Sequence, residues 1–191
     1  AETATRLRTF AAAHDLDLGT IVHGAWAVLM HRYAREEEIL FGTAHDRRPE
    51  LETAPVTTGH FGTVLPLGIG IDPADSIVPW LRELQTTLET GRRHAAVPFA
   101  TVVGGHRLAR HAMPFESVVR YECQALGAAL AELDPVWRDR AVRLETRSGA
   151  ALTLTAIDGA AITLRLDHDR RRVSPTAAER LLGHVSMLLQ G

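Results

Sequence analysis

The chain has 191 residues, of which 46% are hydrophobic, 23% are charged and 5% are aromatic, so it is long enough for one hydrophobic core and short for two domains. Every basic residue is arginine and the formal net charge is -2, which leaves no broad basic surface for a nucleic-acid backbone. Cys123 is the only cysteine, so an intramolecular disulfide is excluded, a reducing compartment is favoured, and we expect a small buried side chain there.

The first part of the chain predicts two helices joined by a turn. Residues 4–14 have the composition of a short helix, and the turn-like residues 15–19 separate it from a stronger helix over residues 20–33. Thr20 is a suitable N-cap for this second helix. Its apolar side chains cover more than half of the helical wheel, which predicts burial on more than one side. They are Ile21, Val22, Ala25, Trp26, Leu29, Met30 and Tyr33.

Two strand-like segments follow this helix. Residues 39–43 form a short apolar run that predicts a buried strand, and the residues 45–55, rich in charge and proline, predict a loop. Residues 61–71 are apolar almost throughout, as in a central strand covered on both faces. Pro66 lies within this run. We therefore expect a bulge or a strand end there, because proline cannot donate a hydrogen bond to a neighbouring strand.

A third helix and a long loop occupy the middle of the chain. Asp75 or Ser76 is a suitable N-cap, Pro79 is tolerated in the first turn, and Gly91 is a suitable end. One face of this helix carries the apolar residues Ile77, Trp80, Leu81, Leu84 and Leu88. The prolines and glycines that follow predict a short helical segment and then a loop that reaches residue 114.

The last part of the chain predicts three strands. Residues 115–121 predict the first strand, and residues 126–133 predict a short helix or loop after it. Residues 151–157 and 161–166 predict a hairpin, because the dipeptide Asp158-Gly159 between them is a strong turn signal.

The chain closes with a helix that has a clear start, at the N-cap Ser174 with Pro175 in the first helical position. The alternating helices and strands predict an α/β (α+β) fold, a mixed β-sheet with helices packed on it, in a single domain over residues 1–191. No apolar run reaches the roughly 20 residues that cross a bilayer, and the N-terminus lacks a signal-peptide pattern. We therefore expect a soluble, cytoplasmic protein with no membrane or nucleic-acid partner.

A search for a self-contained active site finds no clear candidate. The ten histidines include no HExxH pair, and the spacing of His106 and His111 does not place both on one helix face, so we predict no metal site. In Asp167-His168-Asp169, strand alternation sends the histidine to the face opposite the two aspartates, as at an ordinary strand end. His23 faces either a core or a cleft, and we favour a hydrogen-bonded core histidine. A nucleophile paired with a histidine distant in sequence stays open.

Three landmarks occur in a recognisable order. Phe41-Gly42-Thr43 with Arg48-Pro49 comes first, the stretch TGHFGTVLPL at residues 58–67 second, and HAAVPF at residues 94–99 third. In this order and at these spacings they resemble the C-terminal half of the condensation domains of nonribosomal peptide synthetases, which belong to the chloramphenicol-acetyltransferase-like acyltransferases. That family carries its catalytic histidine in an HHxxxDG motif of the N-terminal half, and no such motif occurs here. The resemblance therefore implies one lobe of a two-lobed enzyme, without a catalytic residue of its own.

The resemblance extends over essentially the whole chain, from the helix at residues 20–33 to the last strand and helix at residues 161–191. The family pattern GxFVNTLPLR places its asparagine on Thr63 and its arginine on Gly68. The change at Thr63 removes an amide that could position a substrate group. A small hydroxyl residue common in the family falls on Asp46.

The implied reaction is attack by the amine of an acceptor aminoacyl thioester on a donor acyl thioester. Both substrates would arrive on 4'-phosphopantetheine arms, so this chain would bind no cofactor directly. Its partners would be the N-terminal condensation lobe, peptidyl carrier proteins and adjacent synthetase domains. By resemblance, the substrate tunnel lies between the two lobes. The tunnel residues expected in this chain are Asp46, Phe61, Thr63 and Leu65, and the loop expected to reach towards the other lobe contains Val97, Pro98, Phe99 and Arg110.

Two alternatives stay open. Phe61 and Leu65 suit plain core packing as well as a tunnel wall; in the tunnel interpretation they would join Val64 and residues 97–99 in an exposed apolar patch on the isolated lobe. The second alternative is a function from another class, a degenerate module that recruits carrier proteins or tailoring enzymes without chemistry. An intact HHxxxDG motif in the preceding sequence would favour the enzyme.

Overall fold

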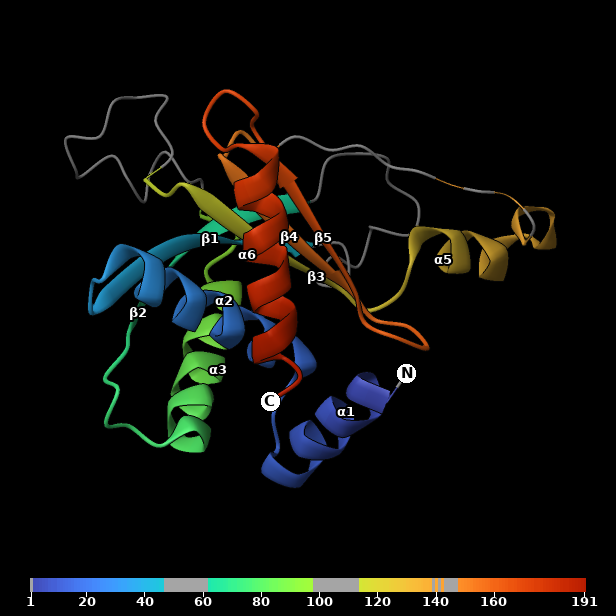
Figure 1. The fold of residues 1–191 in the computed structure, drawn as a ribbon. Helices are drawn as coiled ribbons and strands as arrows, with labels where there is room; N and C mark the ends of the chain where they lie inside the picture. The colour runs from blue at the N-terminus through green and yellow to red at the C-terminus, as the bar shows by residue number, and fades with distance from the viewer. Residues whose placement is uncertain (1, 47–61, 98–113, 139, 141, 143–147) are drawn as a thin grey trace.

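The structure is a computed structural model that describes residues 2–46, 62–97, 114–138, 140, 142 and 148–191 (Figure 1). The helices are α1 (Glu2–His14), α2 (Leu18–Ala34), α3 (Ile77–Arg93), α5 (Leu126–Leu133), the short 3-10 helix η3 (Pro135–Trp137) and α6 (Pro175–Leu188). The strands are β1 (Glu38–Asp46), β2 (Gly62–Gly70), β3 (Ser117–Glu122), β4 (Leu152–Ile157) and β5 (Thr163–His168).

The strands of the described residues form one mixed sheet in the order β2-β1-β3-β4-β5. β1 pairs antiparallel with β2 and parallel with β3, and β4 pairs parallel with β3 and antiparallel with β5. The predicted hairpin is confirmed as β4 and β5, in which Ile157 lies opposite Thr163. Helices pack on this mixed sheet, so the predicted fold class is confirmed (Figure 1).

The position of β2 corrects the prediction of a central strand interrupted at Pro66. β2 lies at the edge of the sheet and pairs with β1 without a bulge over all 9 residues. Half of the N–H groups of an edge strand point away from the sheet, so a proline at one of those positions removes no hydrogen bond. Burial alternates along the strand, with Leu65, Leu67 and Ile69 buried. One face of β2 therefore packs on the core, and the strand is not covered along both faces.

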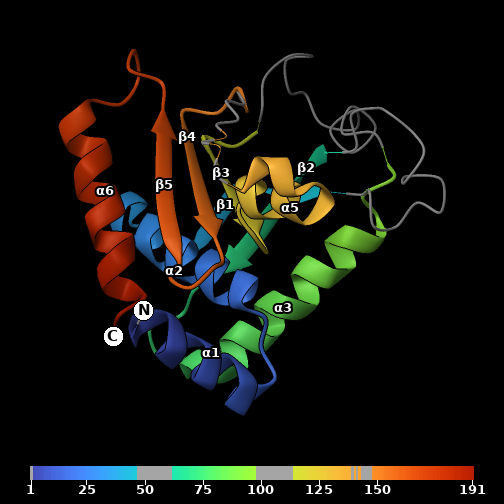
Figure 2. The same cartoon turned by 90° about the vertical axis from the view of Figure 1, so that its right-hand side faces the viewer.

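The main hydrophobic core lies between the sheet and the helices α2, α3 and α6 (Figures 1 and 2). Trp26 of α2, Phe41 of β1 and Leu84 of α3 are fully buried there. The Trp26 indole N–H donates to Ser117 Oγ on β3 at 3.0 Å, so the one polar atom of this side chain is satisfied. As predicted, α2 is buried on more than one side, because it contacts both the sheet and α3.

Two predicted helix boundaries are corrected. α2 begins at Leu18 with Asp17 as its N-cap, and the predicted cap Thr20 lies buried inside the helix. The Thr20 hydroxyl donates instead to Gln85 Oε1 on α3 at 3.2 Å, a contact between helices that the sequence does not reveal. α3 continues through the predicted end at Gly91. No helix within the described ranges is long and apolar enough to span a membrane.

Outside these two helices, one element is confirmed and two expectations are corrected. The final helix begins as predicted, and Ser174 Oγ accepts a hydrogen bond from the Ala177 N–H at 3.2 Å. β1 continues to Asp46, into the segment predicted as a loop. Cys123, expected to be buried, is exposed just after β3.

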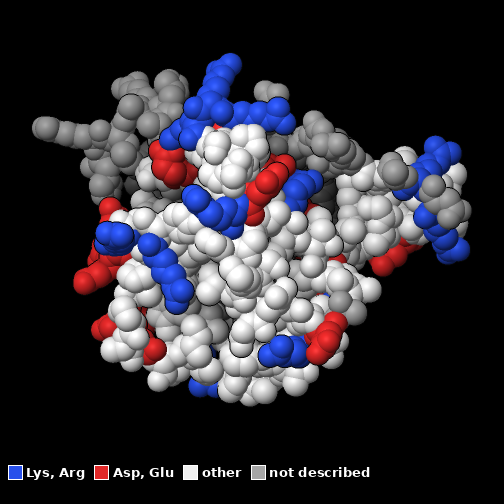
Figure 3. All heavy atoms as spheres, viewed as in Figure 1, with Lys and Arg blue, Asp and Glu red and all other residues white. Residues whose placement is uncertain are grey.

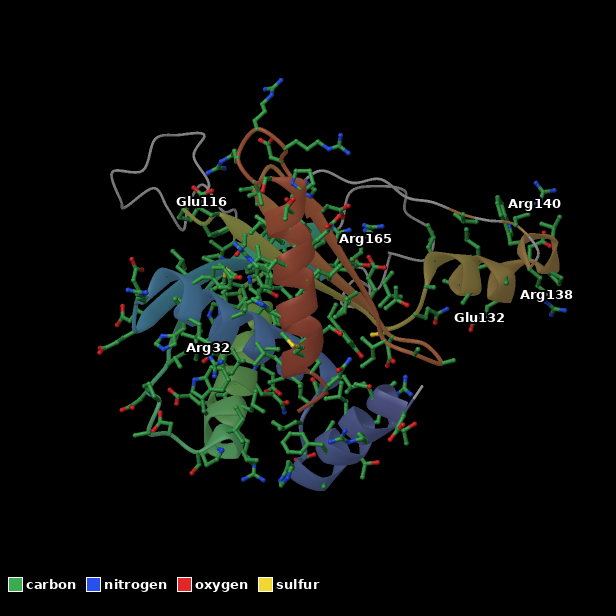
Figure 4. The ribbon with its side chains drawn as sticks, in the orientation of Figure 1. Arg32, Glu116, Glu132, Arg138, Arg140 and Arg165 are labelled. Carbon is green, nitrogen blue, oxygen red and sulfur yellow. The ribbon has the colours of Figure 1, made fainter. Side chains whose placement is uncertain are left out.

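α5 and η3 form an arm that projects from the rest of the molecule (Figures 1 and 2). We define the arm as residues 126–137; it contains no buried residue. Its apolar side chains include Leu133, which is 82% exposed, and Trp137, which is 36% exposed. Charged side chains surround them, as Figure 4 shows for Glu132, Arg138 and Arg140. The arm thus presents apolar surface without cover from the described residues.

Candidate functional site

The structure describes three of the four predicted tunnel residues, Asp46 on β1 and Thr63 and Leu65 on β2; Phe61 lies outside the described residues. Side chains alternate between the faces of a sheet, and directly paired residues share a face. Asp46 pairs with Gly62, so it lies on the face opposite Thr63 and Leu65. The structure therefore brings Thr63 and Leu65 to the helix-covered face and separates Asp46 from them.

Leu65 lies against α3 and is buried. A Cβ atom at Gly91 would lie 3.9 Å from Leu65 Cδ1, which is ordinary packing distance. Leu65 thus packs in the core, and Thr63 is half-buried beside it. The expectation that Leu65 is exposed is wrong, whereas Val64 is half-buried and the rest of the expected patch, apart from Val97, lies outside the described residues.

The loop predicted to reach the other lobe is described only at its first residue. Val97 lies just after α3 and is exposed. Pro98, Phe99 and Arg110 lie outside the described residues.

A buried hydrogen-bonded pair joins α2 to β1 beneath these strands. His23 is buried, with Nε2 2.8 Å from Thr43 Oγ1 and Nδ1 2.6 Å from the Gly19 carbonyl oxygen. The carbonyl can only accept, so Nδ1 carries the proton and Nε2 accepts from the Thr43 hydroxyl. The prediction of a hydrogen-bonded core histidine is confirmed.

The electrostatics of His23 decide what this pair can do. Burial lowers the pKa of His23 to about 4; the hydrogen bond to Gly19 opposes this shift, and the positive charge of Arg92 adds to it. The ring is therefore neutral near pH 7. A base with so low a pKa is a poor acceptor for a hydroxyl proton, because efficient general bases have pKa values near the working pH. The Thr43–His23 pair fixes α2 on the sheet and does not form an activated nucleophile.

A cavity of about 340 Å³ lies between β2 and α3, next to this pair. Thr43, Leu65 and Leu88 line it, together with Thr90 and Gly91 of α3. Because the Thr43 proton is directed to His23, the Thr43 oxygen offers lone pairs to the cavity. Sequence reasoning missed Thr43 as a lining residue, because the only signal is its pairing with Leu65, a residue 22 positions later in the chain.

No group of three metal-ligating side chains occurs within the part of the chain that the structure describes. His106 and His111 lie outside that part. At the end of β5, Asp167 accepts from Arg165 Nε at 3.0 Å, and Asp169, beyond the strand, accepts from the Arg171 N–H at 2.9 Å. The two aspartates thus serve an ion pair and a turn, as at an ordinary strand end.

Solved structures with the same fold extend well beyond this chain. The condensation domain from Monacolin K polyketide synthase MokA aligns with a TM-score of 0.77 and 17% identity, covering 98% of this chain and 45% of that chain. The X-domain from teicoplanin biosynthesis aligns with a TM-score of 0.79 and 16% identity, covering 99% of this chain and 44% of that chain. At these identities the likeness establishes the fold alone. The aligned part, a sheet with its helices, makes up less than half of each solved structure.

Sequence relatives are much longer proteins. One of the linear gramicidin synthase proteins of Brevibacillus parabrevis is 29% identical over 191 residues, which is 100% of this chain and 2% of that protein. Chondramide synthase cmdD of Chondromyces crocatus is 28% identical over 181 residues, covering 91% of this chain and 4% of that protein. The sequence model of the condensation domain matches residues 1–191. The chain therefore belongs to the condensation-domain family.

Proposed function

We propose that the chain acts as the C-terminal lobe of a condensation domain in nonribosomal peptide biosynthesis. The match to the condensation domain over residues 1–191 carries this proposal. The coverage of 45% or less of the single-domain relatives MokA and the X-domain supports assignment to one part of a larger domain. The chain would contribute to amide bond formation together with a second lobe that carries HHxxxDG.

In the proposed reaction, the amine nitrogen of an acceptor aminoacyl thioester attacks the carbonyl carbon of a donor acyl thioester. A C–N bond forms, the C–S bond breaks, the amine loses a proton, and the donor arm leaves as a thiol. Holding two tethered reactants in attack geometry supplies much of the rate enhancement in such a step. The partners would be peptidyl carrier proteins, each delivering a substrate on 4'-phosphopantetheine, and the adjacent synthetase domains.

The residues of this chain would have a supporting role in that reaction. We assign Asp46 to the tunnel mouth and Thr63 to the tunnel lining, at the end of the sheet where β1 and β2 lead into residues 47–61. Leu65 would support the wall from within the core, since it is buried against α3. The His23–Thr43 bond would hold these strands in place relative to α2. Phe61, Pro98, Phe99 and Arg110 stay predictions for the tunnel and its loop.

We assign the arm, residues 126–137, to contact with the second lobe. Leu133 and Trp137 expose apolar surface far from the core, and the arm contains no buried residue. Exposed apolar surface of this kind marks interaction sites. Aromatic residues are enriched among those that dominate binding energy, so Trp137 is the candidate anchor.

Reconstitution tests this function. Mass spectrometry of products on loaded carrier proteins would compare the 191-residue chain alone with the chain joined to an N-terminal condensation lobe. We expect dipeptide only from the joined protein. Dipeptide from the chain alone, above a control without enzyme, would contradict the half-enzyme assignment. The alternative of a recruiting module would be favoured if the N-terminal lobe has a corrupted HHxxxDG motif and the joined protein binds carrier proteins but forms no product.

A further inference from the structure

A separate groove lies between α1 and the helices α2, α3 and α6. Its volume is about 660 Å³, within the range of roughly 300–1,000 Å³ typical of small-molecule sites. Apolar side chains make up most of its wall, including Leu7 and Phe10 of α1, Val28 of α2 and Ile77 and Trp80 of α3. The described tunnel residues Asp46, Thr63 and Leu65 do not line it.

Contacts at the middle and at the end of α1 hold the groove open. Arg8, in the middle of α1, donates to Asp158 and to the Gly159 carbonyl in the turn between β4 and β5. Near the end of α1, the Arg82 guanidinium lies 3.3 and 3.4 Å from the His14 carbonyl oxygen. α1 is thus fixed as an outer wall, with Phe10 between the two anchors and Leu7 next to Arg8.

Small residues on α2 leave room for the groove between α1 and α2. A Cβ atom at Gly24 would lie 2.6 Å from Leu81 Cδ2, so glycine at this position lets α3 approach α2 closely. The adjacent Ala25 lines the groove with a single methyl group. The floor is consequently flat and apolar, and Trp80 from α3 completes it.

The rim of the groove has a basic character. Arg6, Phe10 and His14 are spaced four residues apart on α1, which places them on one face of the helix. Arg6 makes no ion pair or hydrogen bond with any residue that the structure describes, including Glu2 one turn before it. No aspartate or glutamate is among the described residues that line the groove. Figure 3 shows that the nearby surface over the C-terminal half of α6 carries few charged side chains.

We propose that this groove binds a long-chain carboxylate, a fatty acid, with its hydrocarbon chain along Leu7, Phe10 and Trp80 and its carboxylate at Arg6. The apolar wall matches the chain, and the unpaired guanidinium matches the head group. One turn of a helix is about 10–12 Å wide and 5.4 Å long and fills roughly 500 Å³, so the groove holds little more than one turn. A slender chain therefore fits the groove better than a partner helix does.

Titration of the 191-residue chain with laurate, below its micelle concentration, tests the proposal. Trp80 lines the groove, so its fluorescence should change, and Trp137→Phe removes the background of the exposed arm. We expect saturable binding at one laurate per chain, and dodecyltrimethylammonium, with a similar chain and a positive head, should bind more weakly. Arg6→Gln should weaken laurate binding by about threefold, the effect of one exposed ion pair. Arg32→Gln, on α2 outside the groove (Figure 4), should leave binding unchanged.

Two further variants test the apolar wall. Ala25→Phe should fill the groove and abolish binding, with circular dichroism reporting whether the fold is kept. Ile77→Ser, at a position 55% exposed, avoids the risk of misfolding and should weaken binding severalfold. Unchanged affinity in Arg6→Gln and Ile77→Ser would overturn the proposal. Binding of several laurate molecules per chain, or equal affinity for dodecyltrimethylammonium, would also overturn it. A third contradicting result is that the chain binds vesicles of lauroyl lipids but does not bind free laurate.

Discussion

Two tryptophans represent two regions of this molecule that differ in how much of their apolar surface is buried. Trp26, in the helix-covered core, is fully buried and donates its N–H to Ser117. Trp137, in the arm, is partly exposed and has the Arg140 guanidinium 5.8 Å from its ring centroid. The core region completes its burial within the chain. The arm does not do so among the described residues, and this difference underlies our proposal that the core region provides stability and the arm provides recognition.

Truncating each tryptophan tests this comparison with the largest expected effect. Trp26→Ala should lower the free energy of unfolding by about 3–5 kcal/mol, because it leaves a cavity and an unpaired Ser117 hydroxyl. Trp137→Ala should change it by less than about 0.5 kcal/mol, as at other surface positions. Urea unfolding followed by circular dichroism measures both. Similar losses in the two variants would remove the distinction between the regions.

The pH dependence of stability tests the polar part of the core. Unfolded histidine takes up a proton near pH 6.5, whereas folded His23 does so only near pH 4, so the unfolded state binds more protons between these values. Stability should therefore fall as pH decreases through this window, by about 2 kcal/mol between pH 7 and pH 5 from this residue. His23→Gln should remove this part of the pH dependence, whatever its stability at pH 7.

A smaller effect is expected where two glycines on the same face of the sheet differ in packing. A Cβ atom at Gly42 would lie 2.5 Å from Phe115 and 2.7 Å from Val64, whereas a Cβ at Gly68 would meet nothing within 4 Å. Gly42→Ala should cost about 1–2 kcal/mol, since overpacking outweighs the gain from a stiffer unfolded chain. Gly68→Ala, on the neighbouring strand, should be neutral or slightly stabilising. Thermal unfolding of both variants decides this, and equal melting temperatures would contradict the packing described.

The elements of the core could be predicted from sequence because their burial is encoded locally. The wide apolar surface of α2, the Asp158-Gly159 turn and the Ser174 cap each specify an element without reference to the rest of the fold. The errors lie where a distant partner decides. Thr20 has the chemistry of a cap but bonds to Gln85, and Pro66 is tolerated because β2 has only one neighbouring strand.

The candidate site was harder to predict for a physical reason. Period-two alternation shows that Thr63 and Leu65 share a face, but only the pairing of β1 with β2 shows that Asp46 lies on the other face. The exposure of the arm was also missed. Its apolar residues have the composition of a core helix, and the sequence pattern does not show that they stay exposed among the described residues.

Binding to an N-terminal condensation lobe is the most direct test of the proposal that the arm forms the interface between the two lobes. The 191-residue chain would be titrated by calorimetry with an N-terminal condensation lobe, comparing Leu133→Glu in the arm with Met187→Glu at an exposed position of α6. The account predicts that Leu133→Glu weakens binding by about tenfold or more, as expected for a central apolar contact, while both variants unfold like the wild type and Met187→Glu binds like it. Wild-type affinity in Leu133→Glu, or an equal loss in both variants, would contradict the assignment of the arm to the lobe interface.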